Sequence, residues 1–158
     1  RSSLSCYTNA ALQCFKQLAP QELLSNYLQD YEYICLHVPF PKMVHKAIKR
    51  LGEYCGWDAT EIHNQYMRKV YSTMDWNMQI GNSYTASLWF SVANTFTKLY
   101  TKQKLLAFSY GSGCGAELLS LQCTNNQDNS EWKHQLITDL ENRKFIDHNI
   151  YQTIRDKQ

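Results

Sequence analysis

The chain has 158 residues, which is about the length of one domain. Its 16 Lys and Arg against 14 Asp and Glu leave a formal charge of +2, which argues against a dedicated nucleic-acid binder with a dense basic face. With 44% hydrophobic and 19% charged residues the composition excludes wholesale disorder, and apolar runs much shorter than a bilayer predict no transmembrane helix.

The first third of the chain alternates helical and strand patterns. Apolar residues spaced by three and four predict helices, and a β-branched and aromatic run predicts a buried parallel strand. Two prolines directly after that run end it in a turn, because proline fixes its backbone and lacks an N–H. The elements predicted here are helices over 4–18 and 22–28, a strand over 31–36 and a helix over 43–51.

In the rest of the chain, the residue pattern predicts a β-hairpin that lies between helices. The polar and aromatic stretch 57–79 indicates only a short helix and a loop. The elements that follow are a helix over 88–100, a strand over 105–110, a glycine turn over 111–115, a returning strand over 116–123, and helices over 130–140 and around 150–154. Buried strands that alternate with helices favour an α/β layered domain, with the strands over 31–36 and 105–110 as neighbours in one sheet.

Three turns at the ends of these elements carry polar residues that could do chemistry. His37 follows a strand, where ligands bind in open α/β sheets, although it could also be satisfied by nearby backbone. Asn82 precedes a helix and is either an N-cap or a donor to a carbonyl oxygen or water. Ser112 lies in the glycine turn, which is either a plain β-turn or a place where the backbone approaches a ligand closely.

Charged residues near these turns also have two interpretations. Lys42 and Lys46 begin a basic helix just after the His37 turn, which is either a solvated face or a guide for an anionic ligand. Glu117 follows the glycine turn at a strand position that could bury it, and such a residue is more often structural than catalytic.

The six cysteines show no C-x-x-C spacing, so neither a zinc knuckle nor a thioredoxin motif is expected. Four of them fall inside apolar patterns: Cys6, Cys14, Cys35 and Cys55. Free cysteine is among the most buried residue types, and we expect buried free thiols of a cytosolic protein.

Taken together, the turns resemble the hydroxymethylglutaryl-CoA synthase family. The segments HVPFPKMVHKA (37–47), GNSYTASL (81–88) and FSYGSG (108–113) come in that family's order, and the opening SCYTNAAL resembles the helix before its histidine strand. FSYGSG is highly specific, whereas the Gly-Asn pair is shared with other thiolase-superfamily condensing enzymes. The resemblance covers about residues 3–145. It implies half of a thiolase-type fold, a mixed sheet packed with helices, with 1–158 as the carboxy-terminal half and 124–158 as a helical extension of the same domain.

The resemblance also implies an activity. Family members are acyltransferases that condense acetyl-CoA with acetoacetyl-CoA, in the cytoplasmic mevalonate pathway of isoprenoid biosynthesis. The CoA thioesters are substrates, no cofactor or metal is expected, and the full-length protein is expected to be a homodimer without nucleic-acid or membrane partners. By resemblance the catalytic residues are His37 in acid/base chemistry, Asn82 in the polar network around the carbonyls, and Ser112 in hydrogen bonding. The residues expected to bind substrate or CoA are Lys42, Lys46, Pro39, Tyr84 and Gly111.

One departure from the family changes what the chain is expected to do alone. The family's nucleophilic cysteine and catalytic glutamate lie upstream of the first motif, and nothing here matches either, so we expect this chain to be inactive without an amino-terminal half. Three alternatives remain open: a polyketide β-branching synthase acting on carrier-bound acyl groups, a noncatalytic CoA-binding half-domain, and a ketoacyl synthase III type. The lysine after the His37 turn favours the CoA-using type, and the FSYGSG stretch counts against the third alternative.

Overall fold

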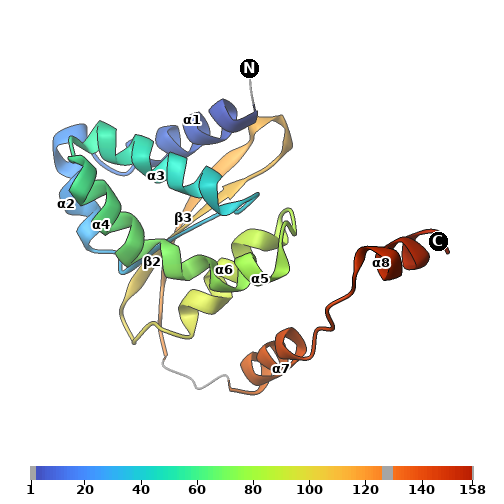
Figure 1. Ribbon diagram of the computed structural model, residues 1–158. Helices are drawn as coiled ribbons and strands as arrows, with labels where there is room; N and C mark the ends of the chain where they lie inside the picture. Colours follow the sequence, from blue (N-terminus) through green and yellow to red (C-terminus); the bar gives the residue numbers. More distant parts are fainter. Residues whose placement is uncertain (1–2, 126–129, 158) are drawn as a thin grey trace. The chain divides into compact units, whose positions relative to one another are not determined.

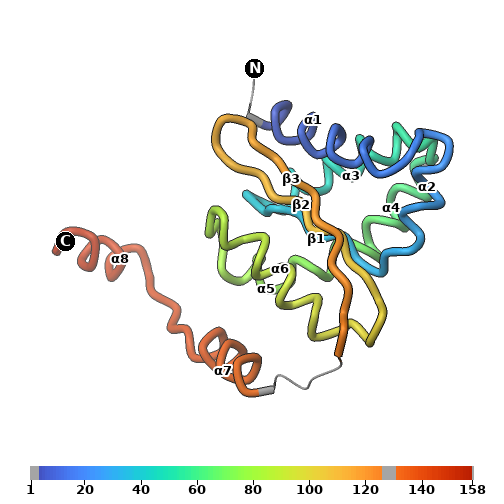
Figure 2. Tube along the Cα trace, turned by 180° about the vertical axis from the view of Figure 1, so that it is seen from behind, coloured from blue at the N-terminus to red at the C-terminus, as the bar shows by residue number. Residues whose placement is uncertain are grey.

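The computed structural model describes residues 3–125 and 130–157 and centres on a three-stranded mixed sheet. Strand β1 (Tyr33–Leu36) runs parallel to β2 (Lys104–Tyr110), and β2 pairs antiparallel with β3 (Ala116–Gln122) in a hairpin. Figure 2 shows β3 running along β2 at the edge of the sheet. The prediction that the two buried strands are neighbours in one sheet is therefore confirmed.

Helices cover both faces of the sheet (Figure 1). On one face lie α1 (Ser3–Lys16), α2 (Gln21–Gln29) and α3 (Pro41–Cys55), and on the other lies α6 (Ala86–Phe96). Successive side chains of a strand point to opposite faces. Leu106 and Phe108 accordingly join the first core, while Leu105 and Ala107 join the second. The continuous apolar run of β2 is thus buried on both faces, as its sequence predicted.

The edge strand β3 is more exposed than β1 and β2. Only half-buried leucines of this strand, such as Leu118 and Leu119, pack against the two cores. Glu117 is exposed, so the expectation that its strand position could bury it is wrong. Position at the edge does not explain this by itself, because β1 is also an edge strand of the described sheet and is buried; β3 differs in that its side chains pack only partly against the two cores.

The stretch 57–79 is more helical than its composition indicated. It forms α4 (Ala59–Lys69), a 3₁₀ turn η1 (Tyr71–Met74) and α5 (Asp75–Ile80). Asp58 caps α4 by accepting a hydrogen bond from the Glu61 N–H at 2.8 Å, and Ile62 and Tyr66, four residues apart, are buried. The aspartate followed three residues later by a glutamate was therefore a start signal.

Helix α6 ends at Phe96, four residues earlier than predicted. Near its end, the hydroxyl of Thr95 donates to the Ser91 carbonyl at 2.7 Å and that of Thr97 to the Asn94 carbonyl at 2.6 Å. Such local side-chain bonds compete with continuation of the helix. Leu99, which the helical pattern included, is buried from the following loop instead.

All six cysteines are free, but they are less buried than expected. Of the four in apolar patterns, Cys35 alone is fully buried, because its side chain lies in the second core with Leu88 and Val92 of α6. Cys6, Cys14 and Cys55 are half-buried on helices at the margin of the core. Burial raises the pKa of Cys35 to about 12 and that of Cys55 to about 11, so both stay protonated thiols.

The chain divides into two compact units, residues 1–127 and 128–158. The second unit contains α7 (Ser130–Glu141) and α8 (His148–Arg155), and none of its described side chains is buried. Asp147 caps α8 by accepting from the Ile150 N–H at 2.9 Å. That residues 124–158 extend the same domain stays a prediction. Within the described part of the chain, no helix is both long and apolar enough to cross a bilayer.

Candidate functional site

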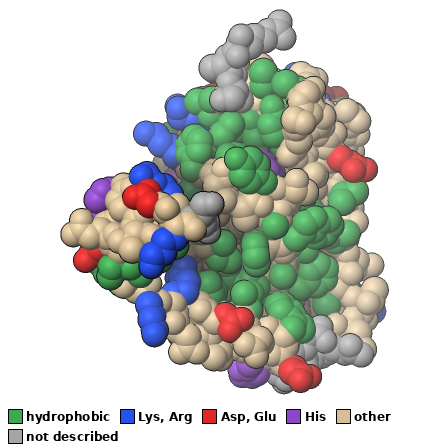
Figure 3. Space-filling view, turned by 90° about the vertical axis from the view of Figure 1, so that its right-hand side faces the viewer, with side chains coloured by type: hydrophobic (Ala, Val, Ile, Leu, Met, Phe, Trp, Pro, Cys, Tyr) green, Lys and Arg blue, Asp and Glu red, His purple; other side chains and the backbone are tan. Residues whose placement is uncertain are grey.

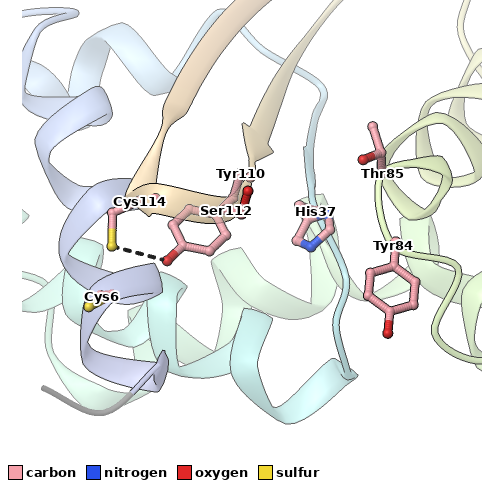
Figure 4. A pocket seen from close by; sticks show the side chains of 9 residues that line it. Cys6, His37, Tyr84, Thr85, Tyr110, Ser112 and Cys114 are labelled. Atoms are coloured by element: carbon pink, nitrogen blue, oxygen red, sulfur yellow. Dashed lines mark hydrogen bonds between the residues drawn. The ribbon is translucent and has the colours of Figure 1, made fainter.

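A pocket of about 460 Å³ opens where β1 and β2 end (Figure 4). Its walls come from α1, the loop after β1, the turn before α6 and the glycine turn after β2. The lining residues are Cys6, His37, Tyr84, Thr85, Tyr110, Gly111, Ser112, Gly113 and Cys114. The carboxyl ends of parallel strands are the usual place for a ligand in an α/β sheet.

His37 is held at this edge by its backbone and its ring. Its N–H donates to the Phe108 carbonyl at 2.8 Å, which extends the β1–β2 ladder by one residue. Its carbonyl accepts the hydroxyl of buried Tyr7 at 2.7 Å. Ring atom Nδ1 lies 3.1 Å from the Ser87 hydroxyl. Burial lowers the pKa of His37 below its ordinary value, so the imidazole is uncharged at neutral pH.

The glycine turn after β2 builds another wall of the pocket. It is closed by a hydrogen bond of 2.8 Å from the Gly111 N–H to the Gly115 carbonyl. Gly113 has φ of 74°, a left-handed conformation that glycine adopts without steric cost. This turn leaves Ser112 exposed at the pocket. The hydroxyl of Tyr110 donates to Cys114 Sγ at 3.7 Å, and this contact raises the pKa of Tyr110 to about 12.

Asn82 lies outside this pocket. It lines a second hollow, of about 240 Å³, together with Pro39. It is not the N-cap of α6, because the helix begins after Thr85. Instead, its side-chain oxygen accepts the Tyr84 N–H at 3.0 Å and supports a turn in which Tyr84 has φ of 53°. Asn82 thus positions Tyr84, a residue that lines the first pocket and is 78% exposed.

The structure therefore brings together part of the predicted set. His37, Tyr84, Gly111 and Ser112 line the first pocket, and Pro39 and Asn82 line the second. The basic pair Lys42 and Lys46 lines neither hollow, because both side chains are exposed near the start of α3, which begins at Pro41.

Several residues of the site were missed by sequence reasoning. Tyr110 stood inside the FSYGSG motif and could have been chosen, because aromatic residues often line ligand pockets. Cys6, Thr85 and Cys114 carried no such signal, and only the fold brings them to His37. Across residues 3–125 and 130–157 there is no cluster of three or more His, Cys, Asp or Glu suited to a metal ion.

Comparison with known proteins identifies the family. Residues 56–156, more than half of the chain, match the family described as hydroxymethylglutaryl-coenzyme A synthase C terminal. The chain belongs to the hydroxymethylglutaryl-CoA synthase family. The match extends from the end of α3 through both helices of the second unit.

Curated relatives include enzymes with two kinds of acyl carrier in their names. The polyketide biosynthesis 3-hydroxy-3-methylglutaryl-ACP synthase PksG of Bacillus subtilis is 27% identical over 121 residues, which are 75% of this chain and 29% of that protein. The hydroxymethylglutaryl-CoA synthase of Enterococcus faecalis is 28% identical over 145 residues, covering 81% of this chain and 37% of the relative. The chain thus spans about a third of the length of the curated relatives it matches.

Solved structures confirm the fold. MvaS in complex with 3-hydroxy-3-methylglutaryl coenzyme A matches with a TM-score of 0.75 and 25% identity over 97% of this chain and 43% of that one. The curacin pathway HMG synthase in complex with acetyl donor-ACP matches with a TM-score of 0.75 and 22% identity, over 97% of this chain and 38% of that one. The expected mixed sheet packed with helices, as part of a thiolase-like fold, is therefore confirmed.

Proposed function

We propose that this chain is the carboxy-terminal part of a hydroxymethylglutaryl-CoA synthase that condenses acetyl-CoA with acetoacetyl-CoA. The observation that carries the proposal is the meeting of His37 and Ser112 in one pocket of a chain that belongs to this family. A neutral imidazole and a hydroxyl can both donate hydrogen bonds to the oxygen of a ketone or thioester under attack. We place the enzyme in the cytoplasm and in the mevalonate pathway.

The chemistry divides between this chain and an upstream part of the protein. The upstream part supplies the cysteine that carries the acetyl group and the glutamate that moves protons. His37 and Ser112 hold the acetoacetyl group, and Asn82 shapes the pocket through Tyr84. Lys42 and Lys46, exposed near the start of α3, attract the phosphates of CoA. No cofactor takes part, since the CoA thioesters are the substrates themselves.

Exposed apolar side chains support the expectation that further protein covers this unit. Phe40 is 50% exposed, Tyr84 78% and Trp89 52%. Figure 3 shows apolar side chains gathered on one face of the molecule. Large apolar patches mark surfaces that bind other protein. We assign such coverage to the upstream part and to a second copy in a homodimer, and we expect the chain alone to be inactive and to aggregate.

A second candidate function is the same condensation with acyl groups on carrier proteins. It is favoured by the relatives, since PksG is named as an HMG-ACP synthase and the curacin enzyme was solved with donor-ACP. The lysines after the His37 turn favour CoA, whose phosphates they would neutralise. A noncatalytic half-domain that only binds CoA thioesters is the remaining alternative.

The decisive experiment supplies the purified chain with the upstream part of its own polypeptide. We expect acetoacetyl-CoA to be consumed with acetyl-CoA as donor, and neither part to be active alone. Turnover only with acetylated carrier protein would show that the enzyme is of the polyketide type and does not use acetyl-CoA. No turnover with either donor, although the upstream part becomes acetylated, would support the noncatalytic alternative. Turnover by the chain alone would mean that one of its own cysteines is the nucleophile, which would overturn the proposed division.

A further inference from the structure

The hydroxyl of Ser87 sits between the backbone and the ring of the pocket histidine. Ser87 is the second residue of α6 and is 0% exposed. Its Oγ lies 2.9 Å from the Val38 N–H and 3.1 Å from His37 Nδ1. Ser87 lies within the GNSYTASL segment (81–88) but was not among the candidate site residues, and it does not line the pocket.

The two contacts determine where the protons lie. A backbone N–H only donates, so Oγ accepts from Val38 and has its own hydrogen left to donate. The other partner of Oγ among the described residues is His37 Nδ1. If Nδ1 carried the ring proton, the Ser87 O–H would be buried without an acceptor, at a cost of about 1–3 kcal/mol. The favoured arrangement has Ser87 donating to an unprotonated Nδ1.

We infer that Ser87 is a positioning residue that holds the neutral ring of His37 in the tautomer with the proton on Nε2. Nε2 has no hydrogen-bond partner within the described residues, and the ring lines the pocket. The histidine therefore offers an N–H donor to whatever occupies the pocket. If the proposed function is correct, that donor serves the ketone oxygen on which negative charge develops during condensation.

The surroundings keep Ser87 in place. Asn77 Nδ2 donates to the Ser87 carbonyl at 2.7 Å, and the Ser91 hydroxyl donates to Asn77 Oδ1 at 2.9 Å. Asn77 is 3% exposed and Ser91 is 0% exposed, so this network is shielded from water. On the other side, the Tyr7 hydroxyl holds the His37 carbonyl at 2.7 Å. The backbone around His37 is therefore held by Ser87 and by Tyr7, and the described side chain that contacts the imidazole ring nitrogen is Ser87.

The test reads the tautomer directly and does not depend on turnover. The chain is labelled with ¹⁵N-histidine, combined with its unlabelled upstream part, and measured by long-range ¹H–¹⁵N correlation NMR above the pKa of the ring. The His37 signals are assigned by their loss in His37→Gln. We expect the wild type to show the proton on Nε2. A wild-type ring protonated on Nδ1 would overturn the inference by itself, with no variant needed.

Matched variants then test Ser87 as the cause. Ser87→Ala should raise the population of the Nδ1-protonated tautomer, and Ser87→Thr, which keeps the hydroxyl, should restore the wild-type pattern. Thr97→Ala removes a hydroxyl from the other end of α6 and should leave the His37 signals unchanged. A tautomer unaltered in Ser87→Ala would show that Ser87 does not control it and would overturn the inference.

Activity separates this inference from the proposed function. In the assembled enzyme, Ser87→Ala should lower kcat about tenfold or more with little change in KM for acetoacetyl-CoA, because it misorients a donor without removing the ring. An equal loss in Ser87→Ala and Ser87→Thr would indicate a merely structural role and count against it. If the assembled protein shows the expected tautomer but no condensation, the proposed function fails and the role of Ser87 stands.

Discussion

The two ends of strand β1 are both held by side chains from distant elements, yet only one end forms a site. Before the first residue of β1, Lys69 of α4 donates to the Leu28 carbonyl at 2.7 Å and to the Tyr31 carbonyl at 2.8 Å. At the end, Ser87 and Tyr7 hold the backbone around His37. Lys69 is 6% exposed and lines neither of the two hollows, whereas His37 faces a pocket.

The difference lies in which polar groups remain available. The ammonium group of Lys69 donates to the Tyr31 carbonyl and to the Leu28 carbonyl, which also accepts the Tyr31 N–H at 3.3 Å, and these hydrogen bonds compensate for the cost of burying the charge. His37 has one ring nitrogen bound to Ser87 and the other without a described partner at the pocket. A buried ionisable group is therefore not by itself a sign of function. The unused donor or acceptor at a cavity is the more informative feature.

The largest expected effect is on activity and comes from the pocket end. In the assembled enzyme His37→Ala should slow condensation on the order of a hundredfold or more, because a hydrogen-bond donor at the reacting oxygen is lost. The acetyl-enzyme should still form, since its cysteine belongs to the upstream part. Acetyl transfer and acetoacetyl-CoA consumption are measured separately. A parallel loss of both would show that His37 is not specific to condensation.

The next largest effect is a loss of stability, from a substitution of Lys69 at the beginning of β1. Lys69→Met should lower the free energy of unfolding by about 1–3 kcal/mol, because the Tyr31 carbonyl loses the ammonium donor and the Leu28 carbonyl keeps only the Tyr31 N–H at 3.3 Å. Urea denaturation followed by circular dichroism measures it. The matched control is Lys49→Met, since Lys49 is exposed and its 3.8 Å ion pair with Glu53 should contribute less than about 1 kcal/mol. Equal losses in the two variants would contradict the role given to Lys69.

A smaller loss is expected when the His37 carbonyl loses its donor. Tyr7→Phe removes a hydroxyl that bonds this carbonyl at 2.7 Å and should lower the free energy of unfolding by about 1 kcal/mol. Tyr27→Phe is the control, because Tyr27 is 36% exposed and its hydroxyl makes a longer contact of 3.3 Å with Tyr31. The interpretation would be wrong if Tyr27→Phe cost as much as Tyr7→Phe.

The smallest expected effect is a pH dependence. Burial lowers the pKa of folded His37, so below about 6.5 the unfolded chain binds more protons than the folded one. Stability should thus be full above that pH and fall as the pH drops towards the folded pKa, below which this group causes no further loss. Denaturation at a series of pH values should show a shallower fall in His37→Gln than in the wild type. Identical pH profiles would contradict a lowered pKa.

Much of the fold was predictable because its signals are local. The apolar run over 31–36 and that over 105–110 each read as a strand buried on both faces, and the glycines over 111–115 indicated the hairpin between β2 and β3. The helical spacing of Ile150 and Ile154 likewise predicted α8. Both side chains are about half exposed, at 47% and 50%, because periodicity defines a face but not its partner.

The sequence by itself determined the strand pair, the hairpin and the turn in which His37 stands, since backbone preferences and apolar periodicity act over a few residues. Tertiary structure alone decided the rest of the site. It places Asn82 in the second hollow and not in the pocket of His37, because α6 begins only after Thr85. It also brought Ser87 to His37 across 50 residues of chain. Such contacts depend on how α6 packs against the end of β1. The residues around a serine in a helix do not indicate which distant side chain its hydroxyl will contact.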